Sequence, residues 1–284
     1  MHVTASGTRL WFDVDGVARA PEGATMRTRP TVVLVHGGPG SYDHSYLKPD
    51  FARLTSIAQV VYLDLRGHGL SGWGKPSEWS HEACADDIRA LCDALGIERP
   101  IVLGHSMGGW IVALYGARHP GHAGGLVLQS TMARYDLERL VEGFRRVAGE
   151  DVAAIARRSY GTSETVSADE GARCFAAFGP LVPDEAQLAR RIQNPDVGAR
   201  GAELMRELDI TGQLGQIDVP TLVSVGELDP VTPVEASHEI VDGLQARVGQ
   251  LDVIPGAGHF PWLDQPSLYW TILERFVADV DAQP

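Results

Sequence analysis

Cysteine is scarce in this 284-residue chain, and long apolar runs are absent. Its three cysteines, Cys84, Cys92 and Cys174, are widely spaced, with no CxxC pair and no histidine at metal-ligand spacing. The spacing excludes a disulfide framework and a zinc site, and it predicts three small buried side chains. The first residues, MHVTASGTRLWFDV, lack the basic start and apolar stretch of a secretory signal, and no run of about 18 apolar residues follows. We therefore expect a cytoplasmic protein that neither crosses nor binds a membrane.

Basic residues are also fewer than acidic ones. The chain has 24 lysine and arginine residues against 37 aspartate and glutamate residues, a formal net charge of −13. Such a negative field repels phosphates and anionic lipid surfaces, so nucleic acid is not an expected partner. The acidic residues are spread along the chain, which indicates a solvated surface rather than an acidic interaction tail. With 44% hydrophobic residues and no repeat of fixed length, the chain is typical of a globular protein with one large core.

Short apolar runs rich in β-branched residues alternate with segments of helical periodicity. The run TVVLVHG at 31–37, for example, is stopped by glycine, as a buried parallel strand is. The predicted strands are 9–14, 31–37, 59–67, 100–106, 124–131, 219–226 and 250–256. The predicted helices are 81–96, 107–120, 233–244 and a last one from about 266. This alternation predicts an α/β fold, a mostly parallel sheet with helices on both faces.

From residue 134 to 209 the pattern changes to consecutive helical stretches. Proline and glycine residues separate them, and no strand pattern returns until about residue 218. The predicted helices here are 136–149, 151–160, 167–179, 183–194 and 199–209. We interpret 134–209 as a helical cap inserted into the core, so that the core consists of residues 1–133 and 210–284. In a parallel α/β sheet the site lies at the carboxyl ends of the strands, where the polar motifs of this chain fall.

The sequence Gly104-His105-Ser106-Met107-Gly108 has the G-x-S-x-G form between a predicted strand and a predicted helix. A sharp strand-to-helix turn holds such a serine in a strained backbone conformation, and the glycines on either side let the strand and helix pack closely. Ser106 is therefore the predicted nucleophile. A serine hydroxyl needs a base that is available near neutral pH, which singles out histidine.

Of the ten histidines, His259 is the predicted base. It follows the last strand through a glycine-rich loop, from which it can reach a serine on a central strand. The orienting acid must come from another strand end, and GELDPVTP after the strand 219–226 offers Glu227 and Asp229. We predict Asp229, because it lies beyond the turn, with Glu227 in reserve. A helix cap or an Asx turn is the structural alternative for Asp229.

The segment HGGPG at 36–40 ends the strand 31–37 and supplies half of a predicted oxyanion hole. Its glycines permit close approach of the backbone, and Pro39 cannot donate, so we pair the N–H of Gly38 with that of Met107. A simple Gly/Pro turn is the alternative. The phosphate-binding motifs G-x-x-x-x-G-K-[ST] and G-x-G-x-x-G are both absent from this segment.

The next strand ends in DLRGHGLS at 64–71. We assign this loop a structural role, with Arg66 at the centre of a hydrogen-bond network that ties strand-end loops together. Four aromatic residues flank these loops and are predicted to line an apolar acyl pocket, with core packing as the alternative. They are Trp73, Trp110, Phe260 and Trp262.

Five motifs together resemble the α/β-hydrolase superfamily: HGGPG at 36–40, DLRGHGLSG at 64–72, GHSMGG at 104–109, GELDPVTP at 226–233 and GAGHFPW at 256–262. The resemblance covers the chain outside the helical segment. It implies a hydrolytic serine triad, in the chain order Ser, Asp, His, without a metal or organic cofactor. Ser106 at the nucleophile position sets the chain apart from the epoxide hydrolase and haloalkane dehalogenase branches, which use a carboxylate there.

Within the superfamily, HGGPG is similar to the prolyl iminopeptidase group, whereas GHSMGG and RGHGLSG look more like esterases, lactonases and C–C bond hydrolases. The expected activity is hydrolysis of a small or medium ester or lactone through an acyl-enzyme on Ser106, with a small molecule as the only expected partner. A proline-type aminopeptidase is the first alternative, because acids of the predicted cap could bind a free amine. These acids are Glu142, Glu150, Glu164, Glu170, Glu203 and Glu207. A C–C bond hydrolase and a binding protein on the same scaffold are further alternatives, and the oligomeric state is left open.

Overall fold

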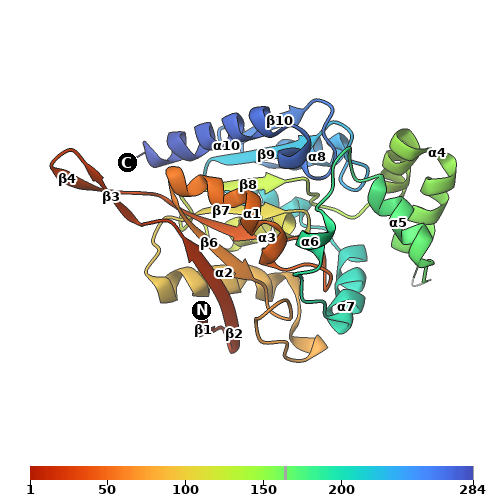
Figure 1. Ribbon diagram of the computed structural model, residues 1–284, viewed down its shortest axis with the longest axis horizontal. Helices are drawn as coiled ribbons and strands as arrows, with labels where there is room; N and C mark the ends of the chain where they lie inside the picture. The colour runs from red at the N-terminus through yellow and green to blue at the C-terminus, as the bar shows by residue number, and fades with distance from the viewer. Residues whose placement is uncertain (163–164, 284) are drawn as a thin grey trace.

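An eight-stranded sheet forms the centre of the computed structural model, which describes residues 1–162 and 165–283 (Figure 1). The strands lie in the order β1-β2-β6-β5-β7-β8-β9-β10. Their bounds are β1 (His2–Ala5), β2 (Thr8–Asp15), β5 (Thr31–Val35), β6 (Gln59–Asp64), β7 (Ile101–His105), β8 (Gly125–Gln129), β9 (Thr221–Gly226) and β10 (Gly249–Ile254). β1 pairs with β2 and β2 pairs with β6 in antiparallel fashion, and the other strand pairs of this sheet are parallel. The predicted α/β fold with a mostly parallel sheet is confirmed.

Helices cover both faces of the sheet, each over its own apolar layer. One layer includes α2 (His81–Leu95), α3 (Met107–Arg118) and α8 (Val234–Gly243). The other includes α1 (Lys48–Phe51), α9 (Pro261–Asp264) and α10 (Pro266–Asp281). Within β5, Val33 and Val35 face the first layer and Val32 and Leu34 face the second. Because both faces are buried, the strand is apolar throughout, which is the pattern its sequence shows.

The apolar pattern predicts neither β1 nor the hairpin of β3 (Arg19–Glu22) and β4 (Thr25–Thr28), which projects from the body of the molecule in Figure 1. Each of these strands has four residues, all partly or fully exposed. Because burial places no demand on their side chains, no apolar run marks them in the sequence. The other short elements are 3-10 helices at His44–Tyr46, Ala52–Ser56, Pro76–Glu78 and Thr211–Gln216.

Between β8 and β9, the part of the chain that the structure describes forms helices and no strand of either sheet. These helices are α4 (Leu137–Gly161), α5 (Ala168–Ala176), α6 (Glu185–Leu188) and α7 (Pro195–Arg206). α4 joins two predicted helices, and Gly149 between them has a φ of 84°, a left-handed conformation that interrupts the regular helix. α6 is a single turn where a helix over 183–194 is predicted, and α7 begins at Pro195 rather than at 199, because proline fits the first helical turn.

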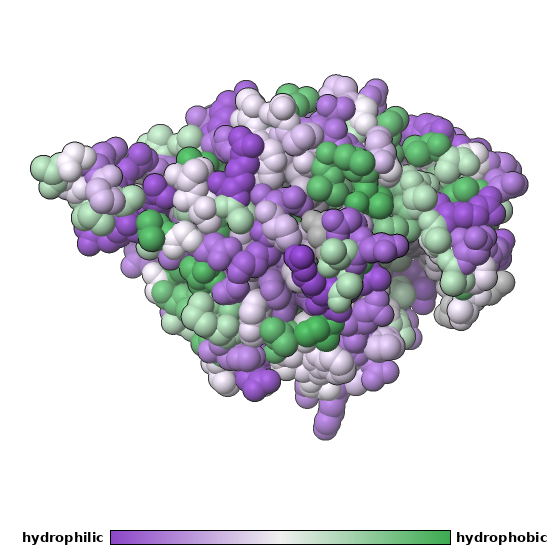
Figure 2. All heavy atoms as spheres, in the orientation of Figure 1, coloured by the Kyte–Doolittle hydropathy of each residue, from purple (hydrophilic) through white to green (hydrophobic). Residues whose placement is uncertain are grey.

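The surface is mainly polar. Hydrophilic residues cover much of the face shown in Figure 2, and hydrophobic ones form small separate groups. The three cysteines are buried thiols without disulfide bonds, as predicted. Within the described ranges, no helix is both long enough and apolar enough to span a bilayer.

Candidate active site

Ser106 lies at the turn from β7 into α3. β5 pairs with β6 on one side and β7 on the other, so the ends of β5 and β7 meet at a topological switch point, where α/β sheets bind ligands. Ser106 has a φ of 55° and a ψ of −119°, a strained conformation for a residue with a side chain. A Cβ at Gly104 would lie 2.1 Å from the Gly108 carbonyl oxygen, and a Cβ at Gly108 would lie 2.3 Å from the Val35 carbonyl oxygen. Only glycine fits at either position, so close packing of this turn requires the G-x-S-x-G pattern.

Asp229 and His259 form a buried hydrogen-bonded pair. The distance from His259 Nδ1 to Asp229 Oδ2 is 2.8 Å, and both residues are almost fully buried. The Thr232 hydroxyl donates to the same Oδ2, and the N–H groups of Val231 and Thr232 donate to Oδ1. Because a carboxylate oxygen accepts, His259 Nδ1 donates this hydrogen bond, and in the neutral imidazole this tautomer has its lone pair on Nε2. Asp229 therefore forms an Asx turn and orients the histidine at the same time.

Ser106 and His259 line the same cavity. No hydrogen bond joins the Ser106 hydroxyl to the His259 ring, both residues being within the described ranges, and such contacts often tighten only in the substrate complex. Glu227, the reserve acid, is exposed, and its Oε2 accepts a hydrogen bond from the Gly256 N–H at 2.9 Å. The structure therefore brings Asp229, and not Glu227, to His259.

A buried hydrogen-bond chain links three loops of this site. The His259 carbonyl can only accept, so His105 Nε2 donates to it at 2.9 Å, and His105 Nδ1 accepts from the Tyr46 hydroxyl at 2.7 Å. The Tyr46 oxygen accepts in turn from the Gly37 N–H at 3.0 Å. Burial lowers the pKa of His105 well below its ordinary value, so this ring is neutral. Both ring nitrogens of His105 are thus engaged in holding the Ser106, His259 and HGGPG loops together.

The predicted oxyanion donors come from two neighbouring strand ends. Gly38 follows β5 with a φ of 65° and lines the cavity, and Met107 is the first residue of α3, directly after Ser106. A first-turn N–H of a helix has no partner within that helix, and the positive end of the helix dipole lies there. A Cβ at Gly38 would lie 2.3 Å from the Tyr42 ring, which restricts this position to glycine. The Met107 side chain packs in the core, so Met107 contributes its backbone N–H to the site.

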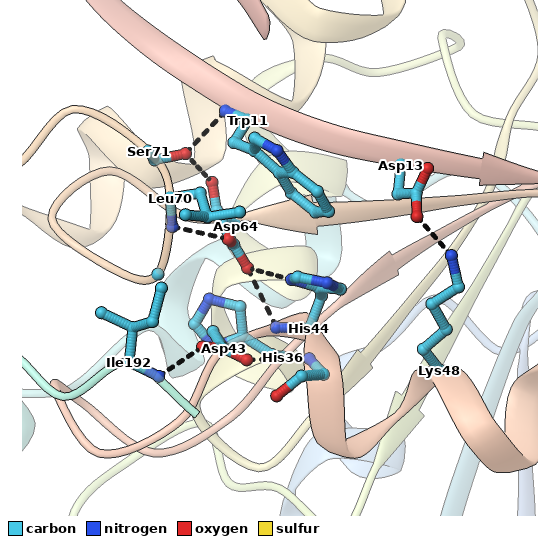
Figure 3. A network of polar contacts seen from close by, with 12 residues as sticks. Trp11, Asp13, His36, Asp43, His44, Lys48, Asp64, Leu70, Ser71 and Ile192 are labelled. Carbon is cyan, nitrogen blue, oxygen red and sulfur yellow. Dashed lines mark hydrogen bonds and ion pairs between the residues drawn. The ribbon is translucent and has the colours of Figure 1, made fainter. Parts of the chain in front are cut away.

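Asp64 and Asp43 support the loops that flank the site (Figure 3). Asp64 Oδ1 accepts from the His44 backbone N–H at 2.9 Å and lies 2.8 Å from the His44 ring, and Oδ2 accepts from the Leu70 N–H. Asp43 Oδ2 accepts from the N–H of Ile192, in the helical segment, at 2.7 Å. Asp43, His44 and Asp64 lie close enough to hold a metal ion, but hydrogen bonds already engage His44 Nδ1 and all four carboxylate oxygens, Asp43 Oδ1 accepting from the Ser45 N–H. We therefore assign this cluster to loop support.

Arg66 forms the predicted network at the end of β6. Its guanidinium donates to both carboxylate oxygens of Asp87 in α2 at 2.6 Å and to the Glu78 carbonyl at 3.0 Å. In the same loop, His68 Nε2 accepts from the Gly40 N–H at 3.0 Å and so joins this loop to HGGPG. These contacts connect the strand-end loops to each other and to α2.

The cavity has a volume of about 170 Å³ and a mainly apolar wall. The helical segment supplies part of this wall, through Leu140, Tyr160, Phe178 and Met205. Among the described residues, no aspartate, glutamate, lysine or arginine lines it. Because a charged group would lose its hydration here without gaining an opposite charge, the cavity suits an uncharged, largely apolar ligand.

Of the four predicted pocket aromatics, the structure places Trp110 and Phe260 in the cavity wall. Trp73 is 45% exposed, and its ring N–H donates to the carbonyl of Gly69 in its own loop. Trp262 is buried in the layer under the sheet, where its ring meets that of Phe51. Trp73 and Trp262 do not line the cavity. A residue that follows a strand in the sequence can pack on either side of its loop, so the sequence does not show which rings face the cavity.

Sequence reasoning missed the four wall residues of the helical segment, Leu140, Tyr160, Phe178 and Met205. Each is one apolar residue among many at helical spacing, and the helical period alone does not separate residues that face a cavity from residues that face the core. Tyr46 was missed for a similar reason, since nothing around it in the sequence indicates a contact with His105.

Comparison with known proteins identifies the family of this chain. The family model described as the alpha/beta hydrolase fold matches residues 30–266. A candidate carbamate hydrolase, RutD, of Caulobacter sp. (strain K31) is 29% identical over 93% of this chain and 97% of its own length. The proline iminopeptidase of Lactiplantibacillus plantarum is 27% identical over 91% of this chain and 96% of its own. The structure of a thermophilic esterase from Thermogutta terrifontis has a TM-score of 0.71 and 27% identity, and the match covers 99% of both chains. The chain therefore belongs to the α/β-hydrolase family, and its relatives support a hydrolase.

Proposed function

We propose that this protein hydrolyses a small or medium ester or lactone with an uncharged, largely apolar acyl group, through an acyl-enzyme on Ser106. The observation that carries the proposal is the hydrogen bond between buried Asp229 and His259, together with a cavity that is lined by both His259 and Ser106 and, among the described residues, by no charged carboxylate, lysine or arginine. A base held in one tautomer next to a serine at a strained turn is the arrangement that nucleophilic acyl transfer requires.

The reaction proceeds in two halves. The Ser106 oxygen attacks the acyl carbon while His259 Nε2 takes the hydroxyl proton, and the N–H groups of Gly38 and Met107 donate to the oxyanion that develops. His259 then gives this proton to the departing alkoxide, which leaves as the alcohol. Water repeats the attack with the same proton transfers and releases the carboxylic acid and free Ser106. Asp229 stabilises the imidazolium in both halves and remains ionised.

The aminopeptidase alternative depends on a carboxylate that could bind a free ammonium group. Of the six acidic residues that motivate it, Glu164 lies outside the described residues, and Glu142, Glu150, Glu170 and Glu203 each pair with an arginine. Glu207 is exposed, and none of the five described acids lines the cavity. A cationic amine would therefore lose hydration without a partner, which favours the ester or lactone.

A substrate panel tests the proposal. We expect the wild type to hydrolyse p-nitrophenyl esters or lactones faster than the fluorogenic amide of proline. Ser106→Ala should lose this turnover by roughly 10⁵-fold or more, because removal of a triad nucleophile leaves only oxyanion stabilisation and binding. Ser56→Ala, which removes an exposed serine, is the matched control. Faster cleavage of the proline amide would favour the aminopeptidase, and failure to react with a fluorophosphonate probe would favour a binding protein.

A further inference from the structure

The loop that carries His259 is held by the helical segment as well as by the sheet. The segment Phe178–Leu181, which follows α5, contacts this loop through two direct hydrogen bonds. The His259 N–H donates to the Phe178 carbonyl at 2.5 Å, and the Leu181 N–H donates to Asp264 Oδ1 at 2.7 Å. The other oxygen of Asp264 accepts from the Gly258 N–H at 2.7 Å. One carboxylate therefore binds a backbone group of the helical segment and the residue next to His259.

The two segments meet backbone against backbone. A Cβ at Gly258 would lie 2.1 Å from the Phe178 carbonyl oxygen, and a Cβ at Gly179 would lie 2.8 Å from Asp264 Oδ2. Side chains are thus excluded from this contact, and a movement of Phe178–Leu181 is transmitted directly to Gly258 and His259.

Phe178 also connects this contact to the cavity. Its ring lines the cavity wall and lies edge-on to the His259 ring, with a distance of 5.3 Å between ring centroids. A ligand that pushes against the Phe178 ring therefore acts on the segment whose backbone holds His259.

We propose that Asp264 is a positioning residue that couples the placement of His259 to the position of Phe178 in the cavity wall, so that acyl size is sensed in catalysis. This inference rests on the proposed function. An acyl group that fits leaves both Asp264 hydrogen bonds intact and His259 aligned. A larger group displaces the Phe178 ring, shifts the Gly258 backbone and misaligns His259. Acyl size therefore changes kcat more than KM.

Asp264→Asn breaks the coupling with little change in shape. An amide offers one acceptor and one NH₂ group, so it can accept from Leu181 or from Gly258 but not from both. For a p-nitrophenyl ester with a short acyl chain we expect kcat to fall about 10- to 100-fold with little change in KM, since small misplacement of a base has effects of this order. For long-chain esters the fall should be smaller, so the preference for short chains decreases. Asp264→Glu, which restores both acceptors, should recover most of kcat.

Glu227→Gln is the matched control, because Glu227 also accepts from a backbone N–H of the β10–α9 loop, that of Gly256, but forms no hydrogen bond with the described part of the helical segment. Equal kcat in Asp264→Asn and Glu227→Gln would overturn the inference, and so would an equal loss for every ester. Gly179→Ala disturbs the same contact from the helical side and should reproduce the loss of short-chain preference if Asp264→Asn does not fold.

Hydrogen exchange provides a measurement that does not need turnover. In Asp264→Asn, peptides that cover 178–183 and 256–260 should both exchange faster, and in Glu227→Gln the peptide 178–183 should be unchanged. Faster exchange in only one of the two peptides of Asp264→Asn would mean that the segments are not coupled. A wild type without ester or lactone turnover would refute the proposed function, whereas normal turnover with uncoupled exchange would refute only the role of Asp264.

Discussion

The carboxyl edge of the sheet and the helical segment between β8 and β9 contribute to the same cavity in different ways. At the sheet edge, backbone geometry limits which residue type can occupy a position. The positive φ of Ser106 and the close contact at Gly104 are two examples. The helical segment supplies apolar wall residues from α4, α7 and the stretch after α5. The residues of the proposed chemistry therefore lie where the chain is most constrained, and the cavity wall is completed where it is least constrained.

The contacts that attach the helical segment to the rest of the molecule are also less constrained than those at the sheet edge. Arg139 and Arg146 of α4 form ion pairs with Glu239 and Glu235 of α8, and Arg134, which precedes α4, also pairs with Glu239. These arginines are partly exposed, so solvent screens the pairs and each contributes little to stability. The apolar cluster shared by α4 and α5 contributes more. Such a segment tolerates changes that the sheet edge does not, and this difference can be tested.

The largest effect is expected at the sheet edge, from Asp229→Asn. The amide cannot stabilise the imidazolium and favours the wrong tautomer of His259, so kcat for an ester should fall about 10⁴-fold. Steady-state kinetics on a p-nitrophenyl ester measures this fall. Glu227→Gln should leave kcat within about threefold of the wild type, since Glu227 does not contact His259 in the described residues. A larger loss in Glu227→Gln than in Asp229→Asn would contradict our choice of the orienting acid.

Two glycine-to-alanine substitutions, one at the sheet edge and one in the helical segment, should have opposite effects on the free energy of unfolding. At Gly104 the new Cβ would lie 2.1 Å from the backbone oxygen of Gly108, so Gly104→Ala should lower the free energy of unfolding by roughly 3 kcal/mol. At Gly171, within α5, a Cβ meets no atom within 4 Å in the described structure, so Gly171→Ala should raise it by about 0.5–1 kcal/mol. Urea unfolding followed by circular dichroism measures both. Similar losses at the two positions would remove the contrast that we draw.

The pH dependence of kcat/KM should show one ionisation on the acid side, with a fall of about tenfold per pH unit. Burial lowers the pKa of His105 well below its ordinary value and lowers the pKa of His68 to about 3, so neither ring accounts for an ionisation between pH 5 and 8. A profile that is flat over this range would contradict the role of His259.

The lowered pKa of His68 also makes stability depend on pH, so the pH profile needs a control for unfolding. Because the folded-state pKa of His68 is lowered from 6.5, the unfolded chain binds a proton that the folded chain does not, and stability falls as the pH drops below 6.5 toward 3. Tm should therefore be measured at each pH, and kinetic data used only where the protein is folded.

The smallest effect is expected in the helical wall. Met205→Ala enlarges the cavity on the side of α7 and leaves every polar contact of the site in place. The preference among esters of different acyl length should shift toward longer chains by about tenfold or less, which is the range for one or two methylene groups in an apolar pocket. A loss of all activity in this variant would show that the helical wall does more than shape the site.

The parallel α/β sheet and the residues at its carboxyl edge could be predicted from the sequence, because buried strands are apolar throughout and strained turns accept few residues. Ser106, Asp229 and His259 could be proposed from such positions, as could the backbone donors at Gly38 and Met107. The exposed hairpin of β3 and β4 could not be predicted, since no burial constrains its sequence.

The folded structure distinguished residues that look equivalent in the sequence. It placed Asp229 rather than Glu227 on His259, and Trp110 and Phe260 rather than Trp73 and Trp262 in the cavity wall. It also brought Phe178 and Asp264 to the His259 loop from positions 81 and 5 residues away in the chain. Contacts of this kind depend on how the helical segment packs over the sheet, and a helical period carries no information about which partner a given face will meet.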